Sequence, residues 1–537
     1  MYRFISDIIG KSSPAYTQSM QIEFLQLTAL IVHFKGYDFD PQTHKKEIIR
    51  FAWSHFKNED ITAKQSAYLL ICRFIEVYET PDKIILQVYV ALLKSYQPEA
   101  KQLVRDALDI MTPTLDKKFV SQDPPHWIKW TRKVIIEDGH SLPLLIHVLQ
   151  LIVRHTDIFY KYRGQFVQHI SNSLARIGLL PNSAPENKKL ACNLVELIIN
   201  WEKRRIEEAK NATEAPTSVE VKQEPTPMAV DESGASDSQG GTTPNAAEAA
   251  SSGPQPPYVP PPTTIEMVVN FVTRMAATPD PKDPTSAQVA SYALDLLREA
   301  LALWPTVNIK FAFFEKLLSP TADQPHYVIT SLNILNVILT FQQKSFLATN
   351  ITALQTSLLP AIASDNMKIT EALAPVLKKI ISEYSTSIRA TLELIFKRIG
   401  ELLEQGVNAE KHNIFNLLYL FKSIVEPSTS SDVLSPYLPH LIKMMMRLAK
   451  EHFAPPQETV NPGSPSPGQP PGAQAKRGSM PPQQQKRDHI PLLRSLQLCA
   501  SQIDNPALVP ELRRNLLHAV YLLIDKTLDV SLNTISQ

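Results

Sequence analysis

Glycine is scarce over most of this 537-residue sequence. Eight of its 15 glycines and 19 of its 43 prolines fall within residues 211–262 and 454–487, which leaves seven glycines for the other 451 residues. Average glycine usage is about 7%, and sheet-rich folds and glycine-rich ligand loops need many residues with positive φ. The scarcity therefore favours a chain that is mostly helical.

Paired cysteines, long apolar runs and an excess of one charge are also missing. The three cysteines, Cys72, Cys192 and Cys499, fit neither a disulfide framework nor a zinc site, so each is predicted to be a small buried apolar side chain. No run reaches the roughly 18 apolar residues of a membrane span, and no basic leader opens the chain, which predicts an intracellular protein without a membrane contact. The formal net charge of +1 predicts no direct sequence-specific binding of nucleic acid.

Helical periodicity dominates what remains. Residues 141–154, SLPLLIHVLQLIVR, begin with a candidate N-cap serine and carry apolar side chains around almost the whole helix, which predicts a helix covered on all sides. Residues 186–210 predict a helix with one face in water. Its apolar stripe consists of Leu190, Leu194, Leu197, Ile198 and Trp201.

Predicted helix pairs recur every 38 to 44 residues. They begin near Asp60, Pro98, Ser141, Ser183, Pro284, Pro325, Met367 and Lys411. A period of about 40 to 47 residues is typical of HEAT and armadillo repeats. The sequence therefore predicts an all-α, HEAT/armadillo-like α-solenoid of antiparallel helix pairs, with a set of unrelated helical bundles as the alternative.

Two segments interrupt the helical pattern. Residues 211–262 are rich in Pro, Ser and Ala and hold seven acidic residues and one lysine, and residues 454–487 are rich in Pro, Gly and Gln. Neither can bury enough apolar surface to offset its chain entropy, so both are predicted to be disordered linkers. They separate HEAT-like repeats over 1–210 and 263–453 and a further helical repeat over 488–537.

Sites of chemistry are not evident. The sequence contains no HExxH, GxSxG, GxGxxG or kinase HRD/DFG pattern, and GKSS at Gly10 lacks the glycine that a phosphate loop has five residues earlier. The 14 histidines do not fall at the helical spacing of a zinc site. We therefore predict no enzyme activity, no catalytic residue, no metal, no cofactor and no small-molecule substrate.

Short modification motifs occur within the two linkers. Lys222, in VKQE, has the aliphatic-Lys-x-Glu order of a SUMO acceptor. Thr226, Ser464 and Ser466 each precede a proline, which is the order that proline-directed kinases accept, and phosphorylation would add about −1.5 to −2 charge at each. These four residues are the candidate modification sites.

Residues 1–70, which begin MYRFISDIIGKSS, and residues 123–152, DPPHWIKWTRKVIIEDGHSLPLLIHVLQLI, resemble a known protein family. They are similar to the central HEAT region of the pseudokinase branch of the phosphatidylinositol-3-kinase-related kinase family. The resemblance implies a segment of a far larger nuclear scaffold without enzyme activity. It also implies two sets of partners, histone acetyltransferase complex subunits and the transcription activators to which the scaffold recruits them.

Two other functions fit an α-solenoid. One is a karyopherin-like transport receptor, which would show Ran-dependent release of cargo. The other is the regulatory helical arm of an active phosphatidylinositol-3-kinase-related kinase, which would require a catalytic domain beyond Gln537.

Overall fold

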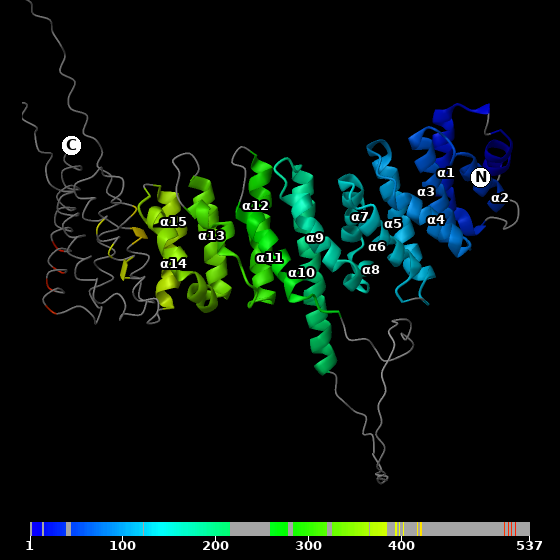
Figure 1. Ribbon diagram of the computed structural model, residues 1–537. Coiled ribbons are helices and arrows are strands. Elements are labelled where there is room, and N and C mark those ends of the chain that lie inside the picture. The colour runs from blue at the N-terminus through cyan, green and yellow to red at the C-terminus, as the bar shows by residue number, and fades with distance from the viewer. Residues whose placement is uncertain are drawn as a thin grey trace, which may run out of the picture. The chain divides into compact units, whose positions relative to one another are not determined.

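The fold was obtained as a computed structural model (Figure 1). The structure describes residues 3–12, 15–38, 44–121, 123–214, 258–277, 283–318, 325–364 and 366–383, together with single positions between 393 and 521. Within these ranges all regular secondary structure is helical, which confirms the all-α prediction. None of the described helices combines the length and the hydropathy that a membrane span requires.

Contacts divide the chain into two compact units, residues 1–177 with 193–264, and residues 178–192 with 265–537. The first unit contains η1 (Phe4–Ser12), α1 (Gln18–Lys35), η3 (Gly36–Asp38), α2 (His44–Ser54), α3 (Ile61–Val77), α4 (Asp82–Leu93), η4 (Pro98–Ala100), α5 (Lys101–Lys118), α6 (His126–Glu137), α7 (Leu142–Arg154), α8 (Thr156–Tyr160) and η5 (Arg163–Gln165). The helices α9 (Val167–Gly178) and α10 (Pro185–Glu214) contribute residues to both units. The remaining elements are α11 (Pro262–Ala277), α12 (Pro284–Leu303), η6 (Phe311–Phe313), η7 (Glu315–Leu318), α13 (Pro325–Phe341), α14 (Gln343–Ile362) and α15 (Met367–Ser382).

The predicted helix starts agree with the observed ones, and side-chain caps explain three of them. The carboxylate of Asp60 accepts a hydrogen bond of 2.7 Å from the Ala63 amide at the start of α3. Asp283 and Asn366 accept in the same way at the starts of α12 and α15. Each cap satisfies one backbone N–H that has no partner within the helix. The start predicted near Lys411 lies outside the described residues.

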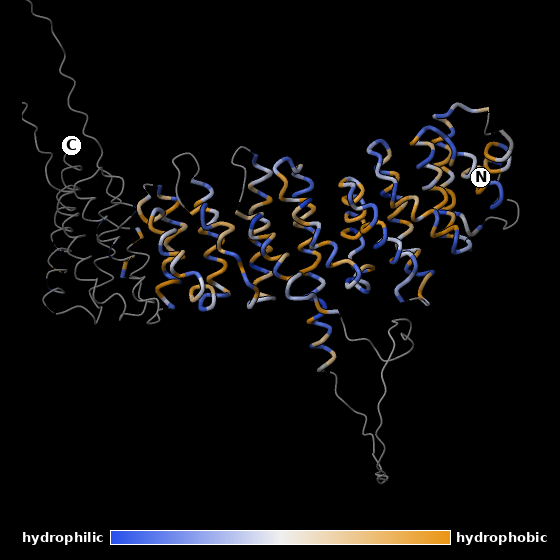
Figure 2. The backbone as a smooth tube through the Cα atoms, in the orientation of Figure 1, coloured by the Kyte–Doolittle hydropathy of each residue, from blue (hydrophilic) through white to orange (hydrophobic). Residues whose placement is uncertain are grey.

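Helices two positions apart along the chain pack against each other in the first unit. One layer runs α1, α3, α5 and α7, and α4 packs against α6 in the other. The predicted burial of residues 141–154 on all sides is wrong for one half of α7. The helix contacts α4, α5, α6 and α8, and its Leu145 and Leu149 are buried, but Ile146 and Val153 are only half-buried. The apolar stripe of α10 is buried. Figure 2 shows how hydrophobic and hydrophilic positions alternate along these helices.

Hydrogen bonds between successive repeats join residues about 40 positions apart. The hydroxyl of Tyr78, just after α3, donates to the carbonyl oxygen of Gly36, just after α1, over 2.7 Å. The Nζ of Lys118, the last residue of α5, donates to the carbonyl oxygen of Tyr78 over 3.2 Å. Each bond supplies a donor to a carbonyl group at a helix C-terminus, where no intrahelical donor is available. The repeat period read from the sequence is therefore also the period of these contacts.

The second unit uses the same kind of link. Its α13 packs against α12, α14 and α15. The side-chain amide Nε2 of Gln342 donates to the carbonyl oxygen of Val307 over 2.8 Å, and the Nζ of Lys379 donates to the carbonyl oxygen of Asn336 over 2.7 Å. Burial lowers the pKa of Lys379, with nearby Arg298 as a second cause. Long polar side chains thus bridge neighbouring repeats in both units.

The structure describes only the two ends of the predicted linker 211–262. Residues 211–214 form the last turn of α10, and residues 258–261 lead into α11. Residues 215–257 and the predicted linker 454–487 lie outside the described residues, and the predicted repeat 488–537 is described at four single positions only. The five predicted segments therefore stay a prediction.

Candidate docking surface

All four predicted modification sites, Lys222, Thr226, Ser464 and Ser466, lie outside the described residues. They stay predictions. The site can therefore be built only from the helical repeats.

The sequence features that resemble catalytic or metal sites have structural explanations. Gly10, in GKSS, belongs to the π-helix η1, so this stretch does not form the strand–loop–helix of a phosphate loop. His55 is buried, and its ring nitrogens lie 2.9 Å from the side-chain oxygen of Gln21 and from the carbonyl oxygen of Phe51. Among the described residues, no three His, Cys, Asp or Glu side chains are grouped closely enough to hold a metal ion.

The described cysteines are core side chains. Cys72 in α3 and Cys192 in α10 are both fully buried and free of disulfides, as the sequence predicts. Burial raises the pKa of the Cys72 thiol far above its ordinary value and that of Cys192 to about 12. A thiol held protonated is a poor nucleophile. Cys499 lies outside the described residues.

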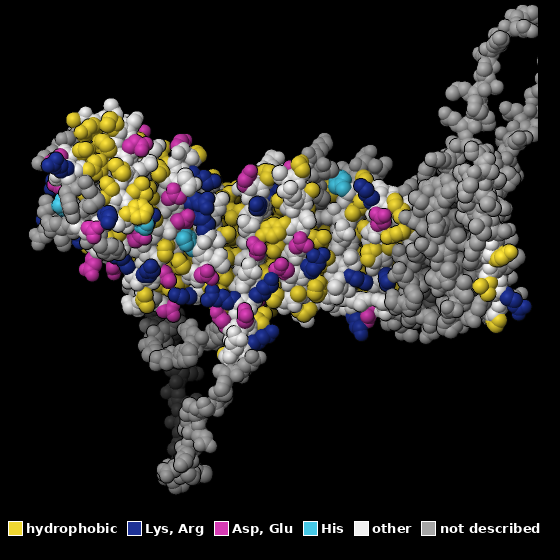
Figure 3. All heavy atoms as spheres, turned by 180° about the vertical axis from the view of Figure 1, so that it is seen from behind, with side chains coloured by type: hydrophobic (Ala, Val, Ile, Leu, Met, Phe, Trp, Pro, Cys, Tyr) yellow, Lys and Arg dark blue, Asp and Glu magenta, His cyan; other side chains and the backbone are white. Residues whose placement is uncertain are grey.

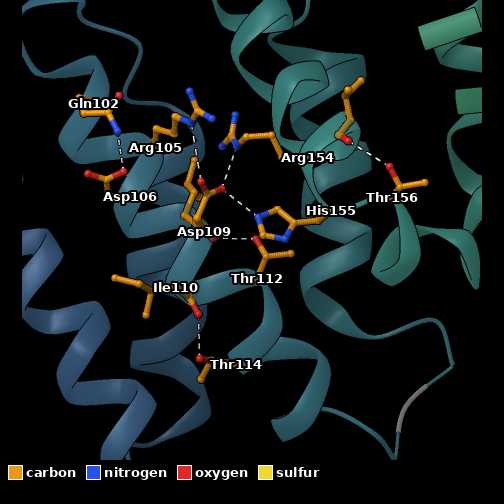
Figure 4. A network of polar contacts seen from close by, with 12 residues as sticks. Gln102, Arg105, Asp106, Asp109, Ile110, Thr112, Thr114, Arg154, His155 and Thr156 are labelled. Carbon is orange, nitrogen blue, oxygen red and sulfur yellow. Dashed lines mark hydrogen bonds and ion pairs between the residues drawn. The ribbon is translucent and has the colours of Figure 1, made fainter. Parts of the chain in front are cut away.

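A polar cluster around Asp109 joins α5 to α7 (Figure 4). The Asp109 carboxylate accepts from Nε of Arg154 over 2.8 Å and lies 2.9 Å from Nε2 of His155. Arg105, one turn earlier on α5, approaches the same carboxylate at 3.7 Å. The Arg154 side chain is only 20% exposed, so this carboxylate balances a partly buried positive charge. The cluster therefore links two neighbouring repeats through their side chains.

A second cluster surrounds Tyr160 near the C-terminal end of α10. The guanidinium groups of Arg163 and Arg204 lie 4.3 Å and 4.1 Å from the centre of the Tyr160 ring, within cation–π distance. The Tyr160 hydroxyl donates to Glu208 over 2.6 Å, and this hydrogen bond is the main cause that lowers the pKa of Glu208. Glu208 also accepts from Arg204 over 2.9 Å. The sequence EKRRIEEAK indicates ion pairs along α10, but it contains no signal for the tyrosine that they enclose.

The Tyr160 cluster also holds the residue at which the described chain resumes before α11. The ring of Tyr258 packs against Gly164, where a Cβ atom would lie 2.9 Å from the ring. An Nη of Arg163 approaches the carbonyl oxygen of Tyr258 at 3.4 Å. The C-terminal end of α10 and the segment that precedes α11 are therefore held by one group of side chains, although 43 residues lie between Glu214 and Tyr258.

Exposed apolar side chains gather on the first unit (Figure 3). The outward stripe of α1 comprises Met20, Leu27, Leu30 and Phe34, which are 44%, 45%, 53% and 73% exposed. Their spacing of three to seven residues places them on one helix face, opposite Leu25, Ala29 and Val32, which are buried. Contiguous exposed apolar side chains are typical of interaction surfaces.

The outward face of α6 combines apolar and basic side chains. Trp130 is 37% exposed and Ile136 is 54% exposed. Lys129 is exposed beside them, and Nζ of Lys133 lies 4.8 Å from the centre of the Trp130 ring. A ligand of such a surface can pair with its positive charge and can bury its aromatic ring away from water.

Comparison with known families gives a match along almost the whole chain. The HEAT repeat ring region of Tra1 proteins matches residues 2–536. The chain belongs to the Tra1 HEAT repeat ring family. This confirms the HEAT solenoid and the resemblance to the pseudokinase branch that the sequence indicates.

Relatives from distant eukaryotes carry the same region. The chain is 35% identical over 507 residues to a probable transcription-associated protein 1 of Dictyostelium discoideum, covering 82% of this chain and 11% of the relative. It is 27% identical over 514 residues to the human transformation/transcription domain-associated protein, covering 84% and 13%. It is also 27% identical over 449 residues to the Saccharomyces cerevisiae SAGA complex/NuA4 acetyltransferase complex subunit TRA1, covering 81% and 12%. The chain thus spans 11–13% of the length of these relatives.

Solved structures include likenesses to other helical solenoids. The alignment with importin beta covers 94% of this chain and 53% of the importin beta chain, at 12% identity and with a TM-score of 0.47.

Proposed function

We propose that the chain is a non-catalytic scaffold segment of a Tra1-type protein that helps to bring transcription activators to histone acetyltransferase complexes in the nucleus. The observation that carries this proposal is the match of residues 2–536 to the Tra1 HEAT repeat ring region, together with relatives that are named acetyltransferase complex subunits. The described residues support the scaffold role, because they form stacked helices.

Repeat architecture gives the scaffold its physical basis. Stacked helix pairs create long helical edges and extended surfaces on which a partner helix can lay its apolar face. The exposed apolar side chains on α1 and α6 are candidates for such contacts. The karyopherin and active-kinase alternatives have no comparable support, since the family match along the chain is to Tra1 proteins.

Deletion within the full-length protein tests the proposal. Tagged full-length protein is compared with a variant that lacks the repeats equivalent to residues 263–453, and both are recovered from nuclear extract. Acetyltransferase subunits and a bound activator are quantified in each eluate, and we expect at least one to be depleted. The matched control lacks only residues 215–257, which removes none of the described helices. Undiminished recovery of both sets of partners from the first variant would show that these repeats are only a spacer.

A further inference from the structure

The outward surface of α4 and α6 is a separate feature from the apolar stripe on α1. We propose that this surface binds an acidic amphipathic helix of a partner protein, an inference that rests on the proposed scaffold function. The surface, called the basic face below, consists of Lys83 and Lys94 on or just after α4, and Lys129, Trp130, Lys133 and Ile136 on α6.

Packing of the two helices makes the basic face one continuous surface. The hydroxyls of Tyr89 on α4 and Thr131 on α6 lie 2.8 Å apart in the buried contact between the helices. Near their C-terminal ends, Nζ of Lys94 lies 2.8 Å from the Asp138 carboxylate. The side of α6 that carries Trp127 and Thr131 is buried, so the lysines, Trp130 and Ile136 remain on the outward side.

The basic face carries more positive charge than its own acids neutralise. Asp138 forms an ion pair with Lys94, and the Glu137 carboxylate lies 3.7 Å from Nζ of Lys133. Among the described residues, Lys83 and Lys129 form no ion pair. Arg132, beside them on α6, donates to the amide oxygen of Gln165 over 2.8 Å rather than to a carboxylate. Complementary charge on a partner would therefore be negative.

Apolar anchors within the same surface decide which anionic partner fits. Trp130 and Ile136 are 37% and 54% exposed, and they lie on the same helix as the exposed Lys129 and Lys133. A nucleic acid backbone offers repeated phosphates but no apolar side chains for these two residues to contact. An acidic helix with one apolar stripe offers both carboxylates and anchors.

A second copy of the chain does not fit the surface. A two-fold contact would place the same lysines opposite each other, and like charges across an interface oppose association. The occupant that matches both the charge and the anchors is therefore an amphipathic helix rich in Asp and Glu.

Binding of a defined peptide tests the inference. The probe is a fluorescein-labelled, helix-forming 16-residue peptide with Leu or Phe at positions i, i+3 and i+7 and Glu elsewhere, titrated with the full 537-residue chain at low and high salt. We expect saturable binding that weakens as salt rises, at least tenfold weaker binding by Trp130→Ala, and severalfold weaker binding by the double variant Lys129→Gln/Lys133→Gln. The double variant removes two positive charges and alters only exposed positions, so it remains informative if Trp130→Ala loses helicity by circular dichroism.

Matched controls separate the outcomes. Lys189→Gln/Lys368→Gln removes two exposed lysines of the second unit and should leave the affinity unchanged. A peptide with Lys in place of Glu should not bind. Equal affinity for the basic-face and control variants, no binding at all, or displacement of the peptide by a 16-base-pair DNA duplex or by self-association would overturn the inference. The proposed function would survive such a result, because the deletion experiment above measures complex membership and does not depend on this surface.

Discussion

The Tyr78 hydroxyl and the Gly36 carbonyl oxygen form a 2.7 Å hydrogen bond that joins the C-terminal ends of α3 and α1. Glycine at position 36 allows this close approach because it has no Cβ atom; a Cβ there would lie 2.9 Å from a methyl group of Val77. Its φ of −61° is helical, so close approach of α3 is the reason for glycine at this position. Gly36 is the C-cap residue of α1, but its backbone lacks the left-handed conformation that is usual for a C-cap glycine.

Removal of this hydrogen bond should weaken the stack. Tyr78→Phe leaves the Gly36 carbonyl without its side-chain donor, and we expect a loss of about 1 kcal/mol of stability. Burial raises the pKa of Tyr78 to about 12, so the hydroxyl remains a donor throughout the neutral range. Hydrogen exchange of peptides from α1 and α3 would report the loss as faster local opening. The control, Tyr96→Phe, alters an exposed tyrosine and should change exchange little; equal effects of the two variants would exclude a role for the bond.

Loss of the Asp109 carboxylate should reduce stability more than loss of the Asp106 carboxylate on the same helix. Asp109→Ala leaves Arg154, only 20% exposed, without its carboxylate, and we expect a loss of about 1–3 kcal/mol. Asp106→Ala, one turn away, removes an exposed contact to Gln102 and should cost less than about 0.5 kcal/mol. Urea denaturation followed by circular dichroism measures both. A smaller loss for Asp109→Ala than for Asp106→Ala would contradict the structural role assigned to this carboxylate.

His147 should make stability depend on pH. Burial lowers its pKa in the folded chain, where Nε2 lies 3.2 Å from the Leu92 carbonyl oxygen and Arg154 and Lys101 add positive charge nearby. Below the unfolded pKa of about 6.5 the unfolded state binds the proton first, so stability should fall as pH falls from that value toward the folded pKa. Urea midpoints at pH 7.5 and 5.5 test this. His147→Gln should show a smaller difference between the two midpoints, and an unchanged difference would assign the effect to other groups such as His169, whose pKa burial and Arg132 also lower.

The outward stripe of α1 should promote self-association of the isolated chain. Leu27→Glu/Phe34→Glu replaces two side chains that are 45% and 73% exposed, so it should reduce self-association without loss of helicity. Sedimentation velocity over a range of concentrations measures the effect. Leu25→Glu, at a fully buried position of the same helix, should instead reduce helicity. If the double variant associates as strongly as the parent chain, the stripe is not the contact.

Sequence periodicity predicts the helices well because each helix buries one face, and its apolar residues therefore recur at helical spacing. The caps Asp60, Asp283 and Asn366 are local signals, and helix starts next to them follow from a few neighbouring residues. These features need no knowledge of residues farther along the chain.

Contacts between repeats are not predictable in the same way. Tyr160 contacts Arg204 and Glu208, which lie more than 40 residues later in the sequence, and Arg163 contacts Tyr258, which lies 95 residues later. No local sequence pattern marks these contacts. The basic face of α6 has a similar origin. A short stretch such as HWIKWTRKVIIE shows an amphipathic helix, but whether Trp130 and Ile136 are covered depends on where neighbouring repeats stack.

Crosslinking mass spectrometry of the intact nuclear assembly tests the central claim most directly, because it measures whether these repeats contact other proteins in place. The informative positions are the exposed lysines of the first unit, Lys83, Lys94, Lys129 and Lys133. The scaffold account predicts crosslinks from these lysines to acetyltransferase complex subunits or to a bound activator. If lysines throughout the chain crosslink only to other parts of the same polypeptide, while subunits of the assembly crosslink to regions outside it, the chain is a spacer and the scaffold account is wrong.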